Sequence, residues 1–531
     1  MRVLFIINDL GINEPFGPMI LSAILKQHGH ETALAVIQKG DVERRIQSFR
    51  PDVLAYSMMS VDLPAMQTFN DDLRKRHSIF TILGGPHCTL DHLIADDPNI
   101  DAICVGEGDQ ALLEVVERLK RRESVEGVAN ILTSSKGSLT MNPLVADLNS
   151  LPAMDRELIY PYPEMASFGI KGIWASRGCI FPCPYCFNNR INHLQHGLGR
   201  TVRRRSVDSM VSEMKKLKKE YRVDFVRIQD DVFAYAADEW LTEFADKWSR
   251  EIGLPFYCLL RSELVTEKIV SLLKKAGCKS ICMSIESSDD DIRVRMMRRK
   301  VSKQELETAF HLFKKYKINV YANTMLALPY TNLETDIANV DFAIQVKPEM
   351  PNFSIFMPYP GTDLGDYCRD TGVYDPKKDT IEYGMRNMSP LLCFTDRVRR
   401  AQYNLCQLAI VAIKLPFLRG VIVNRLIYWR PNAIFFAFHY LFAVTSYGRK
   451  IFPYRHSVQE YFELFWRTLK HYLFDFTQPD AKPGATKVPA RPSAGVDLSE
   501  EKRRSELERC CQAMEGTGQR AYSLVRTMRT L

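Results

Sequence analysis

The sequence predicts an α/β protein in which two parallel-sheet domains precede a mainly helical region. Over residues 1–140, short apolar runs alternate with helical patterns, which is typical of a doubly wound, Rossmann-like sheet. Six further strand–helix pairs over residues 166–370 favour a partial (β/α)6 barrel. From residue 371 onward, apolar helical stretches replace the strand pattern. The fold class follows from these three observations.

The composition is typical of a globular protein and excludes several other classes. The 531 residues are 46% hydrophobic and 25% charged, as in an ordinary globular chain with several cores. A net charge of +8 is modest for this length, so we expect no nucleic-acid partner. The 13 cysteines indicate a reducing compartment, and the apolar run at 3–7 is too short for a signal peptide. We therefore expect a cytoplasmic protein.

In the first domain, the polar and glycine residues follow the predicted strands. Strands are predicted at 3–7, 33–37, 53–57, 80–83 and 102–105, with helices at 19–28, 65–77 and 110–121. Ligands bind such sheets at the carboxyl ends of the strands. The candidates there are Ser57, Gly84, Gly85, Gly106, Glu107 and Gly108. Glycines let a bulky ligand approach the backbone, whereas no G-x-G-x-x-G supports a nucleotide site. His87 is either a turn or core residue or a ligand contact.

A proline-containing linker over 141–165 leads to the barrel. Its strands are predicted at 172–176, 225–229, 256–260, 280–285, 319–326 and 352–357. Helices are predicted at 206–220, 237–251, 265–276, 302–315 and 334–346, with Ser206 as an N-cap. The polar residues at the strand ends are Asp230, Asp231, Arg261 and Glu286. The basic run 298–300 is predicted to be a solvated face.

The most informative stretch is a loop of three cysteines at Cys179-x3-Cys183-x2-Cys186. Gly178, Pro182 and Pro184 disfavour regular structure there, so the loop can aim three thiolates at one point. Iron–sulfur clusters and structural zinc sites normally take four ligands, and no fourth cysteine is near. Three ligands leave one iron open for a substrate or cofactor. The alternative is a zinc knuckle or three ordinary thiols.

This cysteine motif, with an aromatic residue before the third cysteine, resembles the radical S-adenosylmethionine (SAM) enzymes. The resemblance implies a [4Fe-4S] cluster on Cys179, Cys183 and Cys186 whose open iron chelates SAM. One electron then cleaves SAM to a 5′-deoxyadenosyl radical. By the same resemblance, Asp230, Asp231, Arg261 and Glu286 contact SAM. The alternative for each is a cap or a surface salt bridge.

The first domain resembles the cobalamin-binding domain that precedes many radical SAM cores. The resemblance rests on Ser57, on Gly84-Gly85-Pro86-His87 and on Val105-Gly106-Glu107-Gly108. It implies that cobalamin is a cofactor. The sequence departs from the family pattern in this domain at one point. The loop after the first strand, 9–17, lacks the Asp-x-His-x-x-Gly histidine that ligates cobalt, so the lower face of the corrin must be met by another group or left open. The fold could also have been kept without the cofactor.

A second departure concerns the adenosine pocket. The fifth barrel strand ends in Leu326-Ala-Leu-Pro-Tyr330, where the family commonly has Gly-x-Pro-Gly. Ala327 and Tyr330 add side chains, so we expect a differently shaped pocket. Pro358-Tyr-Pro-Gly-Thr362, at the end of the sixth strand, matches the family pattern.

Residues 371–475 are predicted to form a helical C-terminal cap. The apolar stretches 405–418 and 433–444 are too short to span a bilayer and are flanked by Arg, Lys and Trp. They are either buried helices over the barrel or a peripheral membrane element that would suit a greasy substrate. Residues 476–531 are predicted to be a flexible linker, centred on 478–496, and a charged tail helix at 498–509.

The resemblance implies a cobalamin-dependent radical SAM enzyme that methylates an unactivated carbon of a small-molecule or lipid-like substrate. Such a carbon has no acidic proton, so acid–base chemistry cannot reach it. The cluster implies an external one-electron reductant of the flavodoxin or ferredoxin type. Two alternatives remain open: a radical cyclase or rearrangement enzyme without methyl transfer, and a non-catalytic cobalamin- or redox-sensing protein. The sequence names no acceptor.

Overall fold

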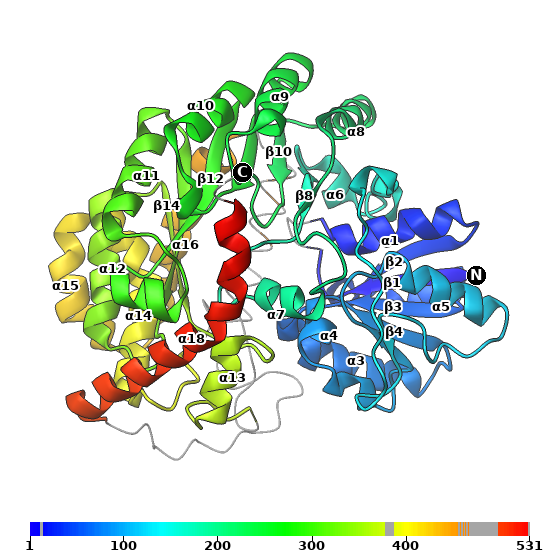
Figure 1. Cartoon of the computed structure of the whole chain (residues 1–531), viewed down its shortest axis with the longest axis horizontal. Coiled ribbons are helices and arrows are strands. Elements are labelled where there is room, and N and C mark those ends of the chain that lie inside the picture. Colours follow the sequence, from blue (N-terminus) through cyan, green and yellow to red (C-terminus); the bar gives the residue numbers. More distant parts are fainter. Residues whose placement is uncertain are drawn as a thin grey trace. The chain divides into compact units, whose positions relative to one another are not determined.

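The computed structural model describes residues 1–10, 14–376, 387–454, 457, 460, 462, 466 and 498–528. The chain divides into two compact units (Figure 1). The first comprises residues 1–168, 176–180 and 187–205, and the second comprises 169–175, 181–186 and 206–531. The cysteine loop therefore runs through both units. The predicted linker at 478–496 lies outside the described residues.

The first unit is built on a six-stranded sheet. Its strands are β1 (Arg2–Ile7), β2 (Glu31–Val36), β3 (Val53–Ser57), β4 (Phe80–Gly84), β5 (Ala102–Cys104) and β6 (Ile131–Leu132). The order is β2-β1-β3-β4-β5-β6; the first five strands are parallel and β6 runs antiparallel to β5. The order 2-1-3-4-5 is that of a flavodoxin-like doubly wound sheet, whose ligand site lies at the carboxyl ends where the order reverses.

Helices cover both faces of this sheet. They are α1 (Phe16–Gln27), α2 (Val42–Phe49), α3 (Leu63–Arg74), α4 (Pro86–Leu90) and α5 (Ala111–Lys120). Leu4 and Ile6 of β1 pack with Ile46 of α2 and Met66 of α3 in one core. The alternate residues of β1 are also buried, which explains why the strand is a continuous apolar run. The predicted strands are confirmed to within two residues. The helix α4 was not predicted, because Gly84-Gly85-Pro86 indicates a turn.

The second unit contains a six-stranded parallel sheet. Its strands are β7 (Ile170–Ile173), β10 (Phe225–Ile228), β11 (Phe256–Leu259), β12 (Cys278–Glu286), β13 (Asn319–Leu326) and β14 (Met350–Ile355). They lie in the order β14-β13-β12-β11-β10-β7, so each strand pairs with the next one along the chain. This is the partial barrel that the sequence predicts, with chemistry expected at the carboxyl ends.

The barrel helices begin and end where the sequence signals them. They are α8 (Val207–Glu220), α9 (Glu239–Lys247), α10 (Glu267–Ala276), α11 (Lys303–Lys315), α12 (Leu333–Val346) and α13 (Asp363–Asp370). The predicted N-cap is confirmed, since the Ser206 side chain accepts a hydrogen bond from the backbone N–H of Ser209. Gly277, with φ 97°, ends α10 in the left-handed region.

The C-terminal region is helical, as predicted. It contains α14 (Asp396–Lys414), α15 (Arg419–Asn424), α16 (Ala433–Ser446) and α18 (Glu500–Met528). The apolar stretch of α14 is buried against α12, β14 and α16. The tail is a helix, but it is more than a solvated segment: Cys510, Cys511 and Met514 are buried. Within the described ranges, no helix combines the length and the apolar content that crossing a bilayer requires.

Candidate active site

The cysteine loop follows the first strand of a short two-stranded ribbon in the first unit. There β8 (Ser176–Arg177) pairs antiparallel with β9 (Arg203–Arg204). Gly178 follows with φ 90°, and a Cβ there would overlap the carbonyl oxygen of Thr201. Only glycine fits this position, because both the backbone conformation and the space exclude a side chain. The chain therefore turns sharply just before Cys179.

The three predicted ligands differ in exposure. Cys179 and Cys183 are buried, and Cys186 is half-buried immediately before α7 (Phe187–Leu194). The backbone N–H of Cys186 donates to the carbonyl oxygen of Cys183 (3.1 Å), and Asn192 Nδ2 donates to that of Cys179 (2.6 Å). In the described ranges, no three His, Cys, Asp or Glu side chains form a group that could hold a metal ion. The ligand assignment therefore rests on the spacing and the family match.

Arg261, which follows β11, lies against the second half of the loop. Its Nη1 donates to Cys183 Sγ at 2.8 Å, and its guanidinium lies 3.8 Å from the ring centroid of Phe181. Burial alone would lower the pKa of Arg261, but Cys183 and Glu263 raise it, so the side chain stays charged. A cation at hydrogen-bond distance from this sulfur complements the negative charge of an iron-bound cysteine. This contact fits a cluster ligand at Cys183.

Glu286, at the end of β12, belongs to a buried hydrogen-bonded network. It accepts hydrogen bonds from Tyr185 Oη and from Arg299 Nη1, both at 3.0 Å. Arg299 also donates to Ser262 Oγ and to both carboxylate oxygens of Glu263. Burial opposes ionisation of Glu263, but Arg299 and Arg261 hold the pKa of that carboxyl far below its usual range. The network ties the loop residue Tyr185 to the strand-end carboxylate.

The prediction for the basic run 298–300 was wrong for its first two residues. Arg298 and Arg299 are 3% and 2% exposed. Arg298 donates to the carbonyl oxygen of Pro182, to that of Met514 and to Asp363 Oδ2. Both arginines thus face the cysteine loop or its supports instead of solvent. The sequence prediction did not include four residues of this network. One sequence signal could have indicated them, namely their proximity to a strand end or to the cysteines: Tyr185, Glu263, Arg298 and Arg299.

The adjacent carboxylates Asp230 and Asp231 lie in different environments. Asp230 is 2% exposed and accepts a hydrogen bond from the backbone N–H of Ala175 (2.7 Å), which fixes the chain just before the ribbon. Asp231 is exposed. The structure therefore brings Asp230 to the end of β7 and does not place the pair side by side in one environment.

The turn after β13, where the sequence departs from the family pattern, has an unusual backbone conformation. Ala327 and Tyr330 stand where the family has glycine, and both have positive φ (57° and 62°). The turn thus keeps the left-handed conformation without glycine, at a cost of roughly 1–2 kcal/mol per residue. Asp336 of α12 supports it: the buried carboxylate accepts hydrogen bonds from Ala327 N–H and from Gln402 Nε2. Burial raises the pKa of Asp336 to about 7.

In the first unit, the predicted ligand positions all lie at the carboxyl edge of the sheet. The residues just before them, Tyr56, Leu83 and Val105, are buried, whereas the candidates keep part of their surface accessible: Ser57, Gly84, Gly85, Gly106, Glu107 and Gly108. Ser57 pairs with Gly84 across β3 and β4. An accessible backbone edge with four glycines fits a flat, bulky ligand such as a corrin. His87 is 3% exposed, with Nδ1 3.1 Å from Ser60 Oγ, so it is a core residue.

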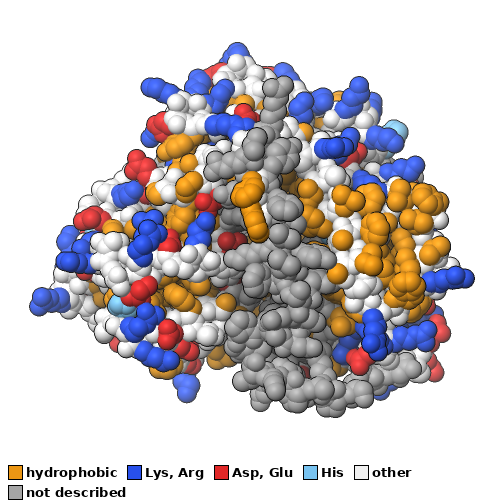
Figure 2. Space-filling model, turned by 180° about the vertical axis from the view of Figure 1, so that it is seen from behind, with side chains coloured by type: hydrophobic (Ala, Val, Ile, Leu, Met, Phe, Trp, Pro, Cys, Tyr) orange, Lys and Arg blue, Asp and Glu red, His pale blue; other side chains and the backbone are white. Residues whose placement is uncertain are grey.

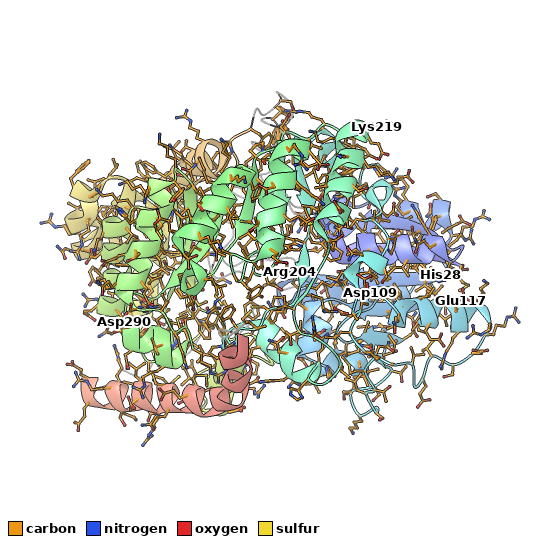
Figure 3. The ribbon with its side chains drawn as sticks, turned by 45° about the horizontal axis from the view of Figure 1, so that its top comes forward. His28, Asp109, Glu117, Arg204, Lys219 and Asp290 are labelled. Carbon is orange, nitrogen blue, oxygen red and sulfur yellow. The ribbon has the colours of Figure 1, made fainter. Side chains whose placement is uncertain are left out.

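Two arginines of the ribbon bind the acidic residues that follow β5. Arg177 makes a bidentate pair with Asp109 (2.7 and 2.9 Å), and Arg203 Nη2 lies 2.6 Å from Glu107 Oε1. Asp109 is labelled in Figure 3. Burial lowers the pKa of Arg177, but its hydrogen bonds to Asp109 raise it overall, so the guanidinium stays charged. The strands that flank the cysteines are thereby anchored to the carboxyl edge of the first sheet, where the predicted cofactor contacts lie.

The helix after the cysteines is anchored to the same edge. α7 packs against α4, which begins directly after Gly85. Gly106, with φ 79°, lies so close to Gln195 that a Cβ would sit 3.3 Å from its Nε2. A cleft of about 620 Å³ in this unit lies beside α1 and α5 and includes His28, Asp109 and Glu114, but none of the predicted strand-end glycines. It is therefore a separate depression.

Comparison with known families identifies both sheets. Residues 3–116 match the B12 binding domain, and residues 175–343 match the Radical SAM superfamily. The first match covers the sheet with the accessible glycine edge. The second begins at Ala175 and includes all three loop cysteines.

Three curated relatives have similar sequences. An uncharacterized methyltransferase of Pyrococcus horikoshii is 23% identical over 336 residues, covering 62% of this chain and 72% of the relative. Anaerobic magnesium-protoporphyrin IX monomethyl ester cyclase of Rubrivivax gelatinosus is 24% identical over 366 residues (65% and 64%). Hopanoid C-3 methylase of Methylococcus capsulatus is also 24% identical over 366 residues (66% and 68%).

Two solved structures share the fold. The radical SAM methyltransferase TsrM from Kitasatospora setae, with tryptophan and a SAM analog bound, gives a TM-score of 0.61 at 14% identity, covering 88% of this chain and 99% of that one. The cobalamin-dependent SAM radical enzyme OxsB gives 0.60 at 13% identity, with 97% and 84% covered. Both alignments extend over the two units.

The fold and the matched segments together define a cobalamin-dependent radical SAM enzyme. Its cofactors are accordingly a [4Fe-4S] cluster, SAM and cobalamin, and it needs a source of electrons. Its named relatives are methyltransferases and a cyclase, so these two reactions are the ones to distinguish.

Proposed function

We propose that this enzyme transfers a methyl group to an unactivated carbon of a small-molecule or lipid-like substrate. The observation that supports it most is the anchoring of the cysteine ribbon to the cofactor edge of the B12-binding sheet through Arg177 and Asp109. A methyl donor and a radical initiator must both reach one substrate carbon. The ion pair fixes the ribbon, and with it the chain just before Cys179, on the sheet that carries the proposed cobalamin contacts, and such positioning favours a group transfer.

We assign Cys179, Cys183 and Cys186 as the cluster ligands. When bound, the three cofactors supply one-electron cleavage of SAM and a transferable methyl group. The protein contributes the charge and the positioning. Arg261 donates a hydrogen bond to Cys183, and Arg298 holds the loop carbonyl of Pro182.

For SAM, the proposed contacts are Asp230, Asp231, Arg261 and Glu286. Arg261 can pair with the SAM carboxylate and Asp231 with an ammonium or hydroxyl group. Glu286 also orients Tyr185 and Arg299, which both donate hydrogen bonds to its Oε1. For cobalamin, the proposed contacts are the accessible edge residues Ser57, Gly84, Gly85, Gly106, Glu107 and Gly108.

The second candidate is a radical cyclisation without methyl transfer, which the cyclase relative favours. Product counting distinguishes the two reactions. Each methylation consumes two SAM molecules, giving S-adenosylhomocysteine from the methyl donor together with 5′-deoxyadenosine and methionine from the cleaved one. Cyclisation that consumes SAM gives only the second pair.

The test is anaerobic purification, reconstitution with iron and sulfide, and addition of cobalamin, SAM and a flavodoxin- or ferredoxin-type reductant. We expect iron–sulfur absorbance, bound corrinoid by mass spectrometry, and both nucleoside products with a lipid-like acceptor. The control is Cys183→Ala, which is expected to lose iron and deoxyadenosine formation. Deoxyadenosine without S-adenosylhomocysteine would contradict methyl transfer. Unchanged turnover in the Cys183 variant would contradict the cluster assignment.

A further inference from the structure

The C-terminal helices expose an unusual number of large apolar side chains. Among the described residues, eight of the fifteen exposed large hydrophobic side chains fall between 417 and 444, each 42–78% exposed. We call these residues the C-terminal apolar patch: Phe417, Val421, Tyr428, Trp429, Ile434, Phe438, Leu441 and Val444. Figure 2 shows the hydrophobic side chains gathered on the right of that view, over the region of α14–α16. A contiguous exposed apolar surface marks an interaction site.

The outer face of α16 is central to this patch. Ile434, Phe438 and Leu441 recur at spacings of four and three, so they share one side of the helix. The opposite side is buried, and His439 there lies 3.1 Å from the carbonyl oxygen of Gln407 on α14. A surface helix normally turns charged residues outward. Here the outward side is apolar although the inward side already fills the core, so the patch is not explained by folding.

The segment that carries the patch has charges of one sign only. Residues 397–454 include no Asp or Glu and nine basic residues: Arg397, Arg399, Arg400, Lys414, Arg419, Arg425, Arg430, Arg449 and Lys450. This segment alone therefore has more positive charge than the net +8 of the whole chain. Arg419 is paired with Asp341 at 2.7 Å, whereas Arg425, Arg430, Arg449 and Lys450 are exposed. An apolar surface on a basic segment matches acyl chains below anionic headgroups.

We propose that the C-terminal apolar patch docks on the surface of an anionic lipid bilayer. Trp429 and Tyr428 suit the headgroup level, because their rings are apolar and carry one polar atom. A second copy of the chain would bring two strongly basic segments together, and like charges oppose such an interface. The described helices also lack a spanning segment, which leaves surface docking as the form of contact. The inference does not depend on the reaction catalysed.

The test is co-sedimentation of the full-length protein with vesicles of phosphatidylcholine, with and without one quarter phosphatidylglycerol. We expect the protein to sediment with the anionic vesicles only. Raising NaCl from about 0.1 M to about 0.5 M should release most of it, because the Debye length falls about twofold. No turnover is measured, so failure here leaves the proposed reaction untouched.

Two pairs of variants separate the apolar and charged contributions. Leu441→Ser should weaken vesicle binding by about tenfold, whereas Leu93→Ser, at an even more exposed position in the first unit, should not change it. Arg430→Glu with Lys450→Glu should abolish binding to anionic vesicles, since each basic residue contributes about fivefold. Lys216→Glu with Lys219→Glu on α8, where Lys219 is labelled in Figure 3, is the control with the same change of net charge.

Circular dichroism and melting temperature should be the same for all four variants, because every substituted side chain is exposed. Absence of wild-type binding to anionic vesicles overturns the proposal. Equal losses in patch and control variants also overturn it, since they would show a net-charge effect only. If light scattering shows a dimer that Leu441→Ser dissociates, the patch binds a second copy and the membrane assignment is wrong.

Discussion

Gly85 offers the sharpest test of the cofactor edge, because its position excludes every other residue for two separate reasons. Its backbone has φ 101° and ψ −177°, a region that only glycine adopts readily. A Cβ there would also lie 2.5 Å from the carbonyl oxygen of Met58 and 2.9 Å from its nitrogen. Both neighbours are backbone atoms of the segment after β3, so neither can rotate away.

The cost of Gly85→Ala can be worked out from two reference positions. Gly84→Ala meets nothing closer than 3.7 Å and needs no positive φ, so we expect a change within about 0.5 kcal/mol. Gly127→Ala has φ 75° with open space around it, which isolates the backbone cost of about 1–2 kcal/mol. Gly85→Ala adds the overlap to the backbone cost, so we expect about 3 kcal/mol or more.

The assay is urea unfolding of the full chain, followed by absorbance of bound corrinoid after reconstitution. We expect destabilisation to increase from Gly84→Ala through Gly127→Ala to Gly85→Ala. Only the Gly85 variant should also lose bound corrinoid. A Gly85 variant no less stable than the Gly127 variant would refute the steric reasoning. Normal corrinoid binding by a destabilised Gly85 variant would instead remove this edge from the cofactor site.

Three other outcomes are expected. Arg261→Gln should still bind iron but shift the cluster midpoint potential to more negative values, because Cys183 loses a cationic donor; an unchanged potential in redox titration contradicts this role. Alanine substitution of Arg177 and Asp109, singly and together, should give a coupling energy of about 2 kcal/mol by double-mutant cycle, since the pair is largely buried; additive effects would show that the anchor is weak. Burial raises the pKa of Asp336 to about 7 from its ordinary 3.8, so the folded chain retains a proton that the unfolded chain loses. Its contribution to stability therefore falls between about pH 4 and pH 7, by at most about 4 kcal/mol, and Asp336→Asn should gain melting temperature relative to the wild type across that interval; a constant difference would contradict the assignment.

Local features of the sequence determined most of the architecture. Strand positions follow from apolar runs such as 3–7, because a strand covered on both faces needs only short-range composition to be recognised. The start of α8 follows from Ser206, whose cap bond spans three residues. The three cysteines and the strand-end glycines were identified in the same way. In each case the signal lies within a few residues of the feature it specifies.

Features that depend on distant partners could not be read from the sequence. A basic run at 298–300 predicts a solvated face. Instead, Arg298 donates a hydrogen bond to Asp363, 65 residues away, and Arg299 donates one to Glu263, 36 residues away. Ala327 and Tyr330 stand where the family commonly has glycine, but nothing local reveals that both keep a left-handed backbone conformation. Likewise, no pattern links Glu107 to Arg203.

The sequence by itself therefore determined the two sheets, the cluster motif and the class of chemistry, because these depend on periodicity and on ligand spacing. Tertiary structure alone decided which charges are buried and paired, since a charge is buried only if a partner is brought to it through the fold. It also decided that the outer face of α16 is apolar, because burial of the other face depends on how α14 packs.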